Sequence, residues 1–187
     1  ITRDWEHIRS TRKPVVAALQ GWTLGGGAEM ALGADIRIAA EGMRFGFPEV
    51  TRGWVGGGGA SQMLPRMIGV ARATRMLMTG DPIEAPEALA LGLVDRVVPQ
   101  AELLSAAREM AAKIAGFSPV AVQSVKASIR MAMEAPLTAG LPPAATSPGR
   151  LSSLTPLPGR HHGAPRAQRG LARRPSTPVS SPCSGGS

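Results

Sequence analysis

The chain has 187 residues, which is enough for one domain with a buried core. Hydrophobic residues make up 43% of it, and no apolar run approaches the roughly eighteen residues of a membrane span, so the composition is typical of a globular protein and we expect no membrane partner. Its one cysteine, Cys183, rules out a disulfide within the chain, which fits a reducing compartment. We therefore expect a cytoplasmic protein.

The net charge of +8 is unevenly distributed. Residues 1–140 hold 15 Lys/Arg and 13 Asp/Glu, a net of +2, whereas residues 141–187 hold six arginines and no acid. Of those last 47 residues, 34 are Ala, Pro, Gly, Arg or Ser, so we expect a disordered tail. The tail has no stacking aromatics and only an isolated His161-His162 pair, so we expect neither a nucleic-acid partner nor a metal site.

Helix and strand patterns alternate along residues 1–140. Residues 1–12 read as a helix that Pro14 ends, and residues 21–27 read as a turn. Apolar runs predict strands at residues 15–19, 36–40, 43–47 and 93–98. Helices are expected at residues 28–32, 60–68, 71–78, 86–90, 101–115 and 119–134. This alternation predicts an α/β fold with parallel strands.

Glu29 follows three glycines, Gly25 to Gly27, at the point where a strand gives way to a helix. Glycines let the backbone approach a ligand closely, and the first N–H groups of a helix lack intrahelical partners. A developing oxyanion could bind there, with the carboxylate facing the same space. A tight turn with a glutamate that only complements the helix dipole is the competing interpretation.

Glu49 follows Phe45-Gly46-Phe47-Pro48 and precedes a second glycine run, residues 56–59. Pro48 fixes its own φ and biases Phe47 toward extended geometry, which makes a stiff mount for the carboxylate. The glycine run could supply N–H groups that face the two glutamates, or it could be only a flexible loop. Two carboxylates beside exposed N–H groups are suited to acid–base chemistry on a polarised carbonyl.

In these motifs the chain resembles the enoyl-CoA hydratase/isomerase (crotonase) family. The resemblance covers about residues 1–138, in order and with the family's spacing. It is carried by five stretches, residues 13–18, 25–35, 45–49, 56–59 and 79–94. It implies a crotonase fold, a right-handed spiral of β-β-α turns followed by helices used in trimer assembly. The domains expected are a partial crotonase-like core at 1–100, a helical segment at 101–140 and the tail at 141–187.

The resemblance also implies an acyl-CoA thioester substrate and specific roles. Glu29 would activate water for attack on C3 of a trans-2-enoyl thioester, and Glu49 would deliver a proton to C2. The N–H of Gly26 would form half of the oxyanion hole, and the N–H of Gly57 would place the water. No cofactor is expected, because CoA is part of the substrate.

Carboxylates at both positions favour hydration, but other readings stay open. An enoyl-CoA isomerase, a related crotonase-family enzyme, and a non-catalytic or RNA-associated module are the alternatives. The family places a β/α region before the Lys13 segment, so we expect that region to be missing from this chain. After about residue 140 the sequence no longer matches the family. Our hypothesis is that a shift of reading frame in the coding DNA produced the tail.

Overall fold

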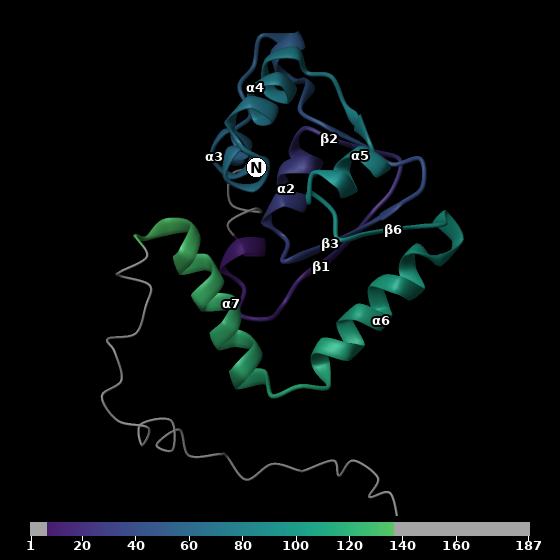
Figure 1. Ribbon diagram of the computed structural model, residues 1–187, viewed down its shortest axis with the longest axis vertical. Coiled ribbons are helices and arrows are strands. Elements are labelled where there is room, and N and C mark those ends of the chain that lie inside the picture. The colour runs from purple at the N-terminus through teal and green to yellow at the C-terminus, as the bar shows by residue number, and fades with distance from the viewer. Residues whose placement is uncertain (1–6, 137–187) are drawn as a thin grey trace, which may run out of the picture. The chain divides into compact units, whose positions relative to one another are not determined.

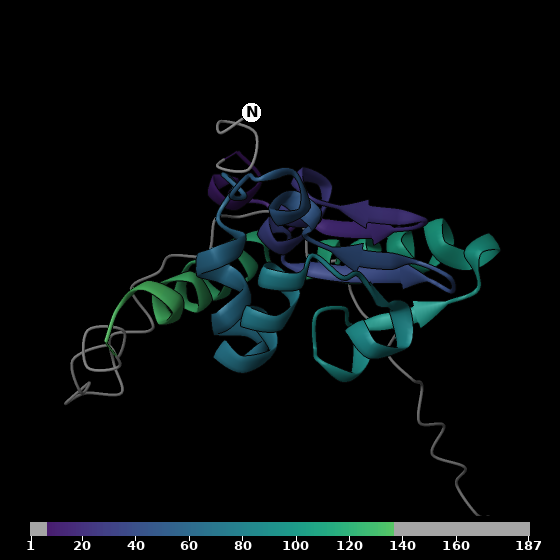
Figure 2. The ribbon, with the colours of Figure 1, turned by 90° about the horizontal axis from the view of Figure 1, so that it is seen from above.

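A computed structural model describes residues 7–136, which Figure 1 and Figure 2 show in two perpendicular views. Residues 7–10 are helical, in agreement with the helix predicted before Pro14. The predicted tail lies outside the described residues, together with His161, His162 and Cys183. Within residues 7–136, no helix combines the length and apolar character needed to cross a membrane.

The described strands form two small sheets. The first has the order β1–β3–β6, with β1 (Val16–Leu19), β3 (Ile36–Ala40) and β6 (Arg96–Val98) all parallel. The second has the order β2–β4–β5, with β2 (Trp22–Leu24), β4 (Arg44–Gly46) and β5 (Ile83–Glu84). In the second sheet β2 and β4 are parallel, and β5 pairs antiparallel with β4.

The first four strands enter the two sheets in turn, and helices follow each of these two pairs. The β1–β2 pair leads into α2 (Gly26–Gly33). The β3–β4 pair leads into the 3₁₀ turn η1 (Pro48–Arg52), then α3 (Ala60–Ile68) and α4 (Val70–Thr79). These are the predicted β-β-α turns. The remaining helical elements are α5 (Ala85–Ala90), η2 (Gln100–Glu102), α6 (Leu103–Ala115) and α7 (Pro119–Glu134).

The predicted helices at 60–68 and 119–134 are confirmed at the same bounds. The prediction for residues 21–27 is wrong in part, because Trp22–Leu24 pairs with β4 as strand β2. The strand predicted at 93–98 is shorter than expected. The N–H groups of Leu93 and Val94 donate to the carbonyl of Ala88, so only Arg96–Val98 joins the sheet. Strand β5 was not predicted, since a two-residue strand leaves no periodic signal.

Strand β3 separates two apolar clusters by the alternation of its side chains. Ile38 and Ala40 pack with Leu103 and Ala106 of α6 in one cluster. Ala39 belongs to the larger cluster on the other face of β3, which also takes in the apolar side of α2. Successive strand side chains point to opposite faces, so Arg37 shares the face of Ala39, toward α2.

A partly buried ion pair ties α7 to the start of the first sheet. The Nζ of Lys126 donates to Oδ2 of Asp35 (2.5 Å) and to the carbonyl of Lys13 (2.8 Å). The same Asp35 oxygen accepts the N–H of Val15 (2.7 Å), just before β1. The Lys126 side chain is only 7% exposed, so this cation is held almost fully out of water.

Candidate active site

The first glycine run connects the end of β2 to the start of α2. Gly25 precedes the helix with φ +53°, a left-handed value that suits glycine, and its N–H donates to the carbonyl of Gly46 (2.9 Å). Its own carbonyl accepts the N–H of Glu29 (2.9 Å), which closes the first helical turn. The predicted placement of Glu29 in the first turn of a helix is confirmed.

Glu29 is buried, and the second glycine run folds around its carboxylate. Its residue exposure is 2%. Its Oε1 accepts the N–H of Gly58 (3.0 Å) and the N–H of Ala60 (3.1 Å). Gly59, between these donors, has φ +97° and precedes α3. The run is therefore an ordered turn that binds a carboxylate rather than a flexible loop. It lies between η1 and the start of α3.

Glu49 is carried by η1, with Pro48 at the first position of that turn. Phe45 and Phe47 lie just before it, fully buried, with ring centroids 5.6 Å apart in an edge-to-face arrangement. The carbonyl of Glu49 accepts the N–H of Trp54 (3.0 Å), which fixes the backbone after the turn. The stiff mount predicted from the sequence is thus made by core packing before Glu49 and a hydrogen bond after it.

The two carboxylates lie close enough to affect one another. Burial is the largest influence on Glu29 and raises its pKa above the ordinary value of 4.5, and the negative charge of Glu49 raises it further. The hydrogen bonds from Ala60 and Gly58 favour the ionised form and lower the pKa in opposition, but burial prevails. A proton is therefore held on Glu29 more strongly than on an exposed glutamate.

Neighbouring glycines in each run do different things. A Cβ placed on Gly25 would lie 3.0 Å from Oε1 of Glu49, and one on Gly56 would lie 2.8 Å from Oε1 of Glu29. A Cβ on Gly26 or Gly57 would meet no atom within 4 Å, and both residues are exposed. The first pair makes room for the carboxylates, and the second borders open space that a ligand can enter.

The structure thus brings Glu29 together with parts of both glycine runs, and it places Glu49 against the first run. The expectation that the second glycine run could present N–H groups to the glutamates is met by Gly58, whereas sequence reasoning missed the second donor, Ala60. The signal was present only as a glycine run just before a helix. Among the described residues, no group of three or more His, Cys, Asp or Glu side chains is arranged to hold a metal ion.

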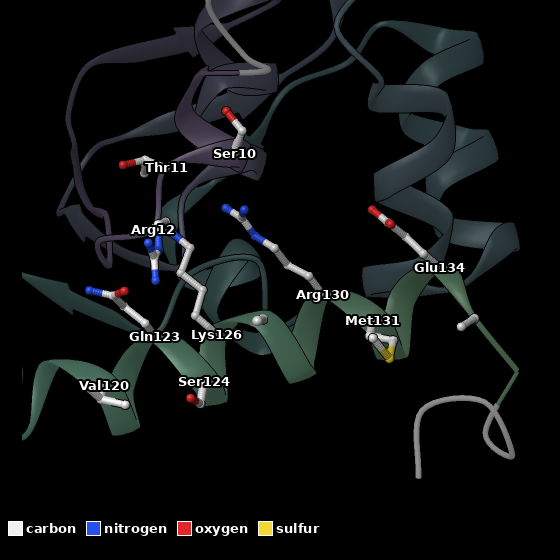
Figure 3. A pocket seen from close by; sticks show the side chains of 12 residues that line it. Ser10, Thr11, Arg12, Val120, Gln123, Ser124, Lys126, Arg130, Met131 and Glu134 are labelled. Atoms are coloured by element: carbon white, nitrogen blue, oxygen red, sulfur yellow. The ribbon is translucent and has the colours of Figure 1, made fainter. Parts of the chain in front are cut away.

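Two pockets lie along α7, away from the two glutamates. The smaller, of about 610 Å³, is seen in Figure 3 between residues 10–12 and α7, with Arg12, Lys126 and Arg130 among its labelled residues. The larger, of about 1140 Å³, lies between α7 and the segment from Leu32 to Arg37, with part of α3 as another wall. Neither hollow is lined by Glu29 or Glu49, so the carboxylate pair forms a separate site.

The fold and this carboxylate arrangement can be compared with known proteins. The family model described as enoyl-CoA hydratase/isomerase matches residues 1–146, so the chain belongs to the enoyl-CoA hydratase/isomerase (crotonase) family. A probable enoyl-CoA hydratase of Rhizobium meliloti is 44% identical over 137 residues, which cover 73% of this chain and 53% of that protein. The 2,3-dehydroadipyl-CoA hydratase of Escherichia coli is 40% identical over 137 residues, with 73% and 54% covered.

Solved structures agree. An enoyl-CoA hydratase from Bacillus anthracis matches with a TM-score of 0.71 and 43% identity, over 73% of this chain and 53% of that one. A Geobacillus kaustophilus enoyl-CoA hydratase subunit matches with a TM-score of 0.72 and 37% identity, over 74% of this chain and 54% of that one. The crotonase-like fold is therefore established. The chain spans about half the length of the curated relatives it matches.

Proposed function

We propose that this protein is an enoyl-CoA hydratase, adding water across the C2=C3 bond of a trans-2-enoyl-CoA thioester. The observation that carries the proposal is the pair of interacting carboxylates, Glu29 and Glu49, set beside two glycines that border open space. Relatives named as enoyl-CoA hydratases at 40–44% identity support the same chemistry. Because the chain spans about half the length of these relatives, its own activity is what an experiment must test.

In the proposed reaction the two carboxylates hold one water and share one proton. Glu29 takes a proton from the water while the water oxygen bonds to C3. The π electrons of C2=C3 then move toward the thioester carbonyl. Glu49 then gives its proton to C2, which restores the carbonyl and leaves a 3-hydroxyacyl thioester. The raised pKa of Glu29 suits the role of base, because a carboxylate of higher pKa takes a proton from water more readily.

Backbone groups complete the proposed centre. The N–H of Gly26, in the first turn of α2, lacks an intrahelical partner by its position and would donate to the thioester oxygen as negative charge develops. The N–H of Gly57 would hold the water. A Cβ at either position would meet only open space, which is what a substrate needs.

Turnover of crotonyl-CoA tests the proposal, because hydration removes the absorbance of the conjugated thioester. Because the chain spans about half the length of its relatives, we expect it to hydrate crotonyl-CoA poorly or not at all. Where hydration is measurable, Glu29→Gln and Glu49→Gln should each reduce kcat by about 10²–10⁴-fold. Turnover of 3-enoyl but not 2-enoyl thioesters would identify an isomerase instead. Binding of crotonyl-CoA without any turnover would favour a non-catalytic module.

We also propose that the protein associates with copies of itself. Val125, Ile129 and Met133 recur every four residues on α7, line the larger hollow, and are 58%, 61% and 43% exposed. Such a row of exposed apolar side chains favours association. Light scattering tests this, and a monomer at micromolar concentration would contradict it.

A further inference from the structure

Arg37 is a buried cation that reaches the C-terminal end of α2. It is 7% exposed and lies on the face of β3 that looks toward this helix. Its NH1 donates to the carbonyl of Ala34 (2.7 Å) and more weakly to that of Ala31 (3.4 Å). Its Nε donates to the carbonyl of Leu93 (2.5 Å), so one guanidinium joins α2 to the segment between α5 and β6.

The helix that Arg37 caps has little stability of its own. α2 has eight residues and includes Gly26, Gly27 and Gly33, and glycine is among the poorest helix formers. It has no basic residue in its last turn and no side-chain cap at its start. A short helix of this kind is held by its ends and by tertiary contacts, and a cation on its last carbonyls is favourable.

Both ends of α2 bear on the candidate active site. The first turn carries Glu29, whose Oε1 is bound by the N–H groups of Gly58 and Ala60. If the last turn of α2 loosens, the helix that carries Glu29 is no longer held at its C-terminal end. The carboxylate would then move relative to the fixed N–H groups of the glycine turn.

We propose that Arg37 is a positioning residue for Glu29: by binding the carbonyls of the C-cap residue Ala34 and of Ala31 at the end of α2, it keeps the Glu29 carboxylate on the N–H groups of Gly58 and Ala60. The inference rests on the proposed function, in which Glu29 is the base. Arg37 itself acts only through the helix.

The guanidinium is suited to this task in a way that lysine is not. Its Nε and NH1 point at carbonyls of two different segments, whereas an ammonium group is a single point charge on a flexible stem. Asp95 fixes the backbone beneath it, since Oδ2 of Asp95 accepts the N–H of Arg37 (2.8 Å) and the N–H of Asp95 donates to the Arg37 carbonyl (2.8 Å). The strand position is therefore set independently of the side chain.

Lys126 provides a matched control. It is also 7% exposed and makes two partly buried hydrogen bonds, but to Asp35 and the Lys13 carbonyl, which belong neither to α2 nor to its C-cap residue. Arg37→Met and Lys126→Met each remove one buried cation. Amide hydrogen exchange of the ligand-free 187-residue chain, followed by NMR, then compares the two. The slowest-exchanging amides report global unfolding and correct for any overall loss of stability.

In Arg37→Met we expect the amides of Gly58 and Ala60 to exchange at least about tenfold faster than global destabilisation explains, since hydrogen bonds to charged groups are lost. In Lys126→Met we expect these two amides to change only in step with the global reference. Arg37→Lys should fall between Arg37→Met and the parent, and it replaces Arg37→Met if that variant does not fold. Unchanged relative protection of Gly58 and Ala60 in the Arg37 variants would overturn the proposal.

The kinetic arm separates this inference from the proposed function. With crotonyl-CoA we expect Arg37→Lys to lower kcat by about tenfold or more with little change in KM, because only the reacting group moves. A rise in KM with unchanged kcat would overturn the positioning role. If the parent chain shows no hydration, the proposed function fails, while the exchange comparison still decides whether Arg37 positions Glu29.

Discussion

Gly56→Ala should disable the site through one added methyl group. The new Cβ would lie 2.8 Å from Oε1 of Glu29, whereas ordinary contacts begin near 3.4 Å, so the carboxylate must retreat by about 0.6 Å. Gly56 is not among the glycines with positive φ, so the backbone itself accepts alanine. The whole effect therefore falls on Glu29.

That retreat removes the carboxylate from both of its donors. Oε1 now sits 3.0 Å from the N–H nitrogen of Gly58 and 3.1 Å from that of Ala60, and a further 0.6 Å exceeds hydrogen-bond range. Losing hydrogen bonds to a buried charged group is expected to cost about 1–3 kcal/mol of stability. Displacement of a reacting group by about 1 Å costs about 10²-fold in rate, which sets the upper end of the expected loss here.

Urea denaturation and crotonyl-CoA hydration measure the two effects. Gly57→Ala is the control for stability, because its added Cβ meets no atom within 4 Å, and we expect its free energy of unfolding to stay within about 0.5 kcal/mol of the parent. If Gly56→Ala keeps parental kcat and parental stability, the reasoning from this contact is wrong.

Three further predictions concern charge. Glu29→Gln should lower kcat by about 10²–10⁴-fold. It should also make the folded protein more stable than the parent at neutral pH, because glutamine still accepts hydrogen bonds from both N–H groups but places no charge in the interior. A free energy of unfolding in urea equal to or lower than that of the parent would contradict this. The raised pKa of Glu29 means that the folded state binds its proton more tightly than the unfolded state, so parental stability should fall as the pH rises from the ordinary value of 4.5 through the folded pKa. Urea midpoints across that window should show the fall in the parent and not in Glu29→Gln, and parallel curves would refute it. Lys126→Met should cost about 2 kcal/mol, because it strands an Asp35 side chain that is 27% exposed, and a smaller cost than 0.5 kcal/mol would mean that water already screens the pair.

Motifs with strong local chemistry were readable from the sequence, and contacts between distant segments were not. The helix at 60–68 was predictable because Gly59 and Gly69 bracket an amphipathic run. The proximity of Glu29 and Glu49 was expected from the family's pattern rather than from spacing, since twenty positions say nothing about distance in space. The run at 56–59 was a candidate source of N–H groups, but backbone donors carry no side-chain signal, so only the folded chain shows that those of Gly58 and Ala60 hold Glu29.

Arg37 shows the same limit in another form. In the sequence it stands among apolar residues of a predicted strand, where a charged side chain is usually taken to face solvent. Its burial follows from tertiary structure, because the carbonyls that accept its hydrogen bonds come from α2 and from Leu93, far along the chain. No local pattern could have supplied that pairing.

The two-faced character of β3 makes the chain sensitive to insertions and deletions at one place. Loss or gain of a single residue between α2 and β3 would reverse every side chain of the strand with respect to its two clusters. Ile38 would then face the open carbonyls of α2, and Arg37 would enter the apolar cluster beneath α6 without acceptors. Frame-preserving length changes at residues 34–36 should therefore be far less tolerated than substitutions there, and length variation among functional relatives should be found elsewhere.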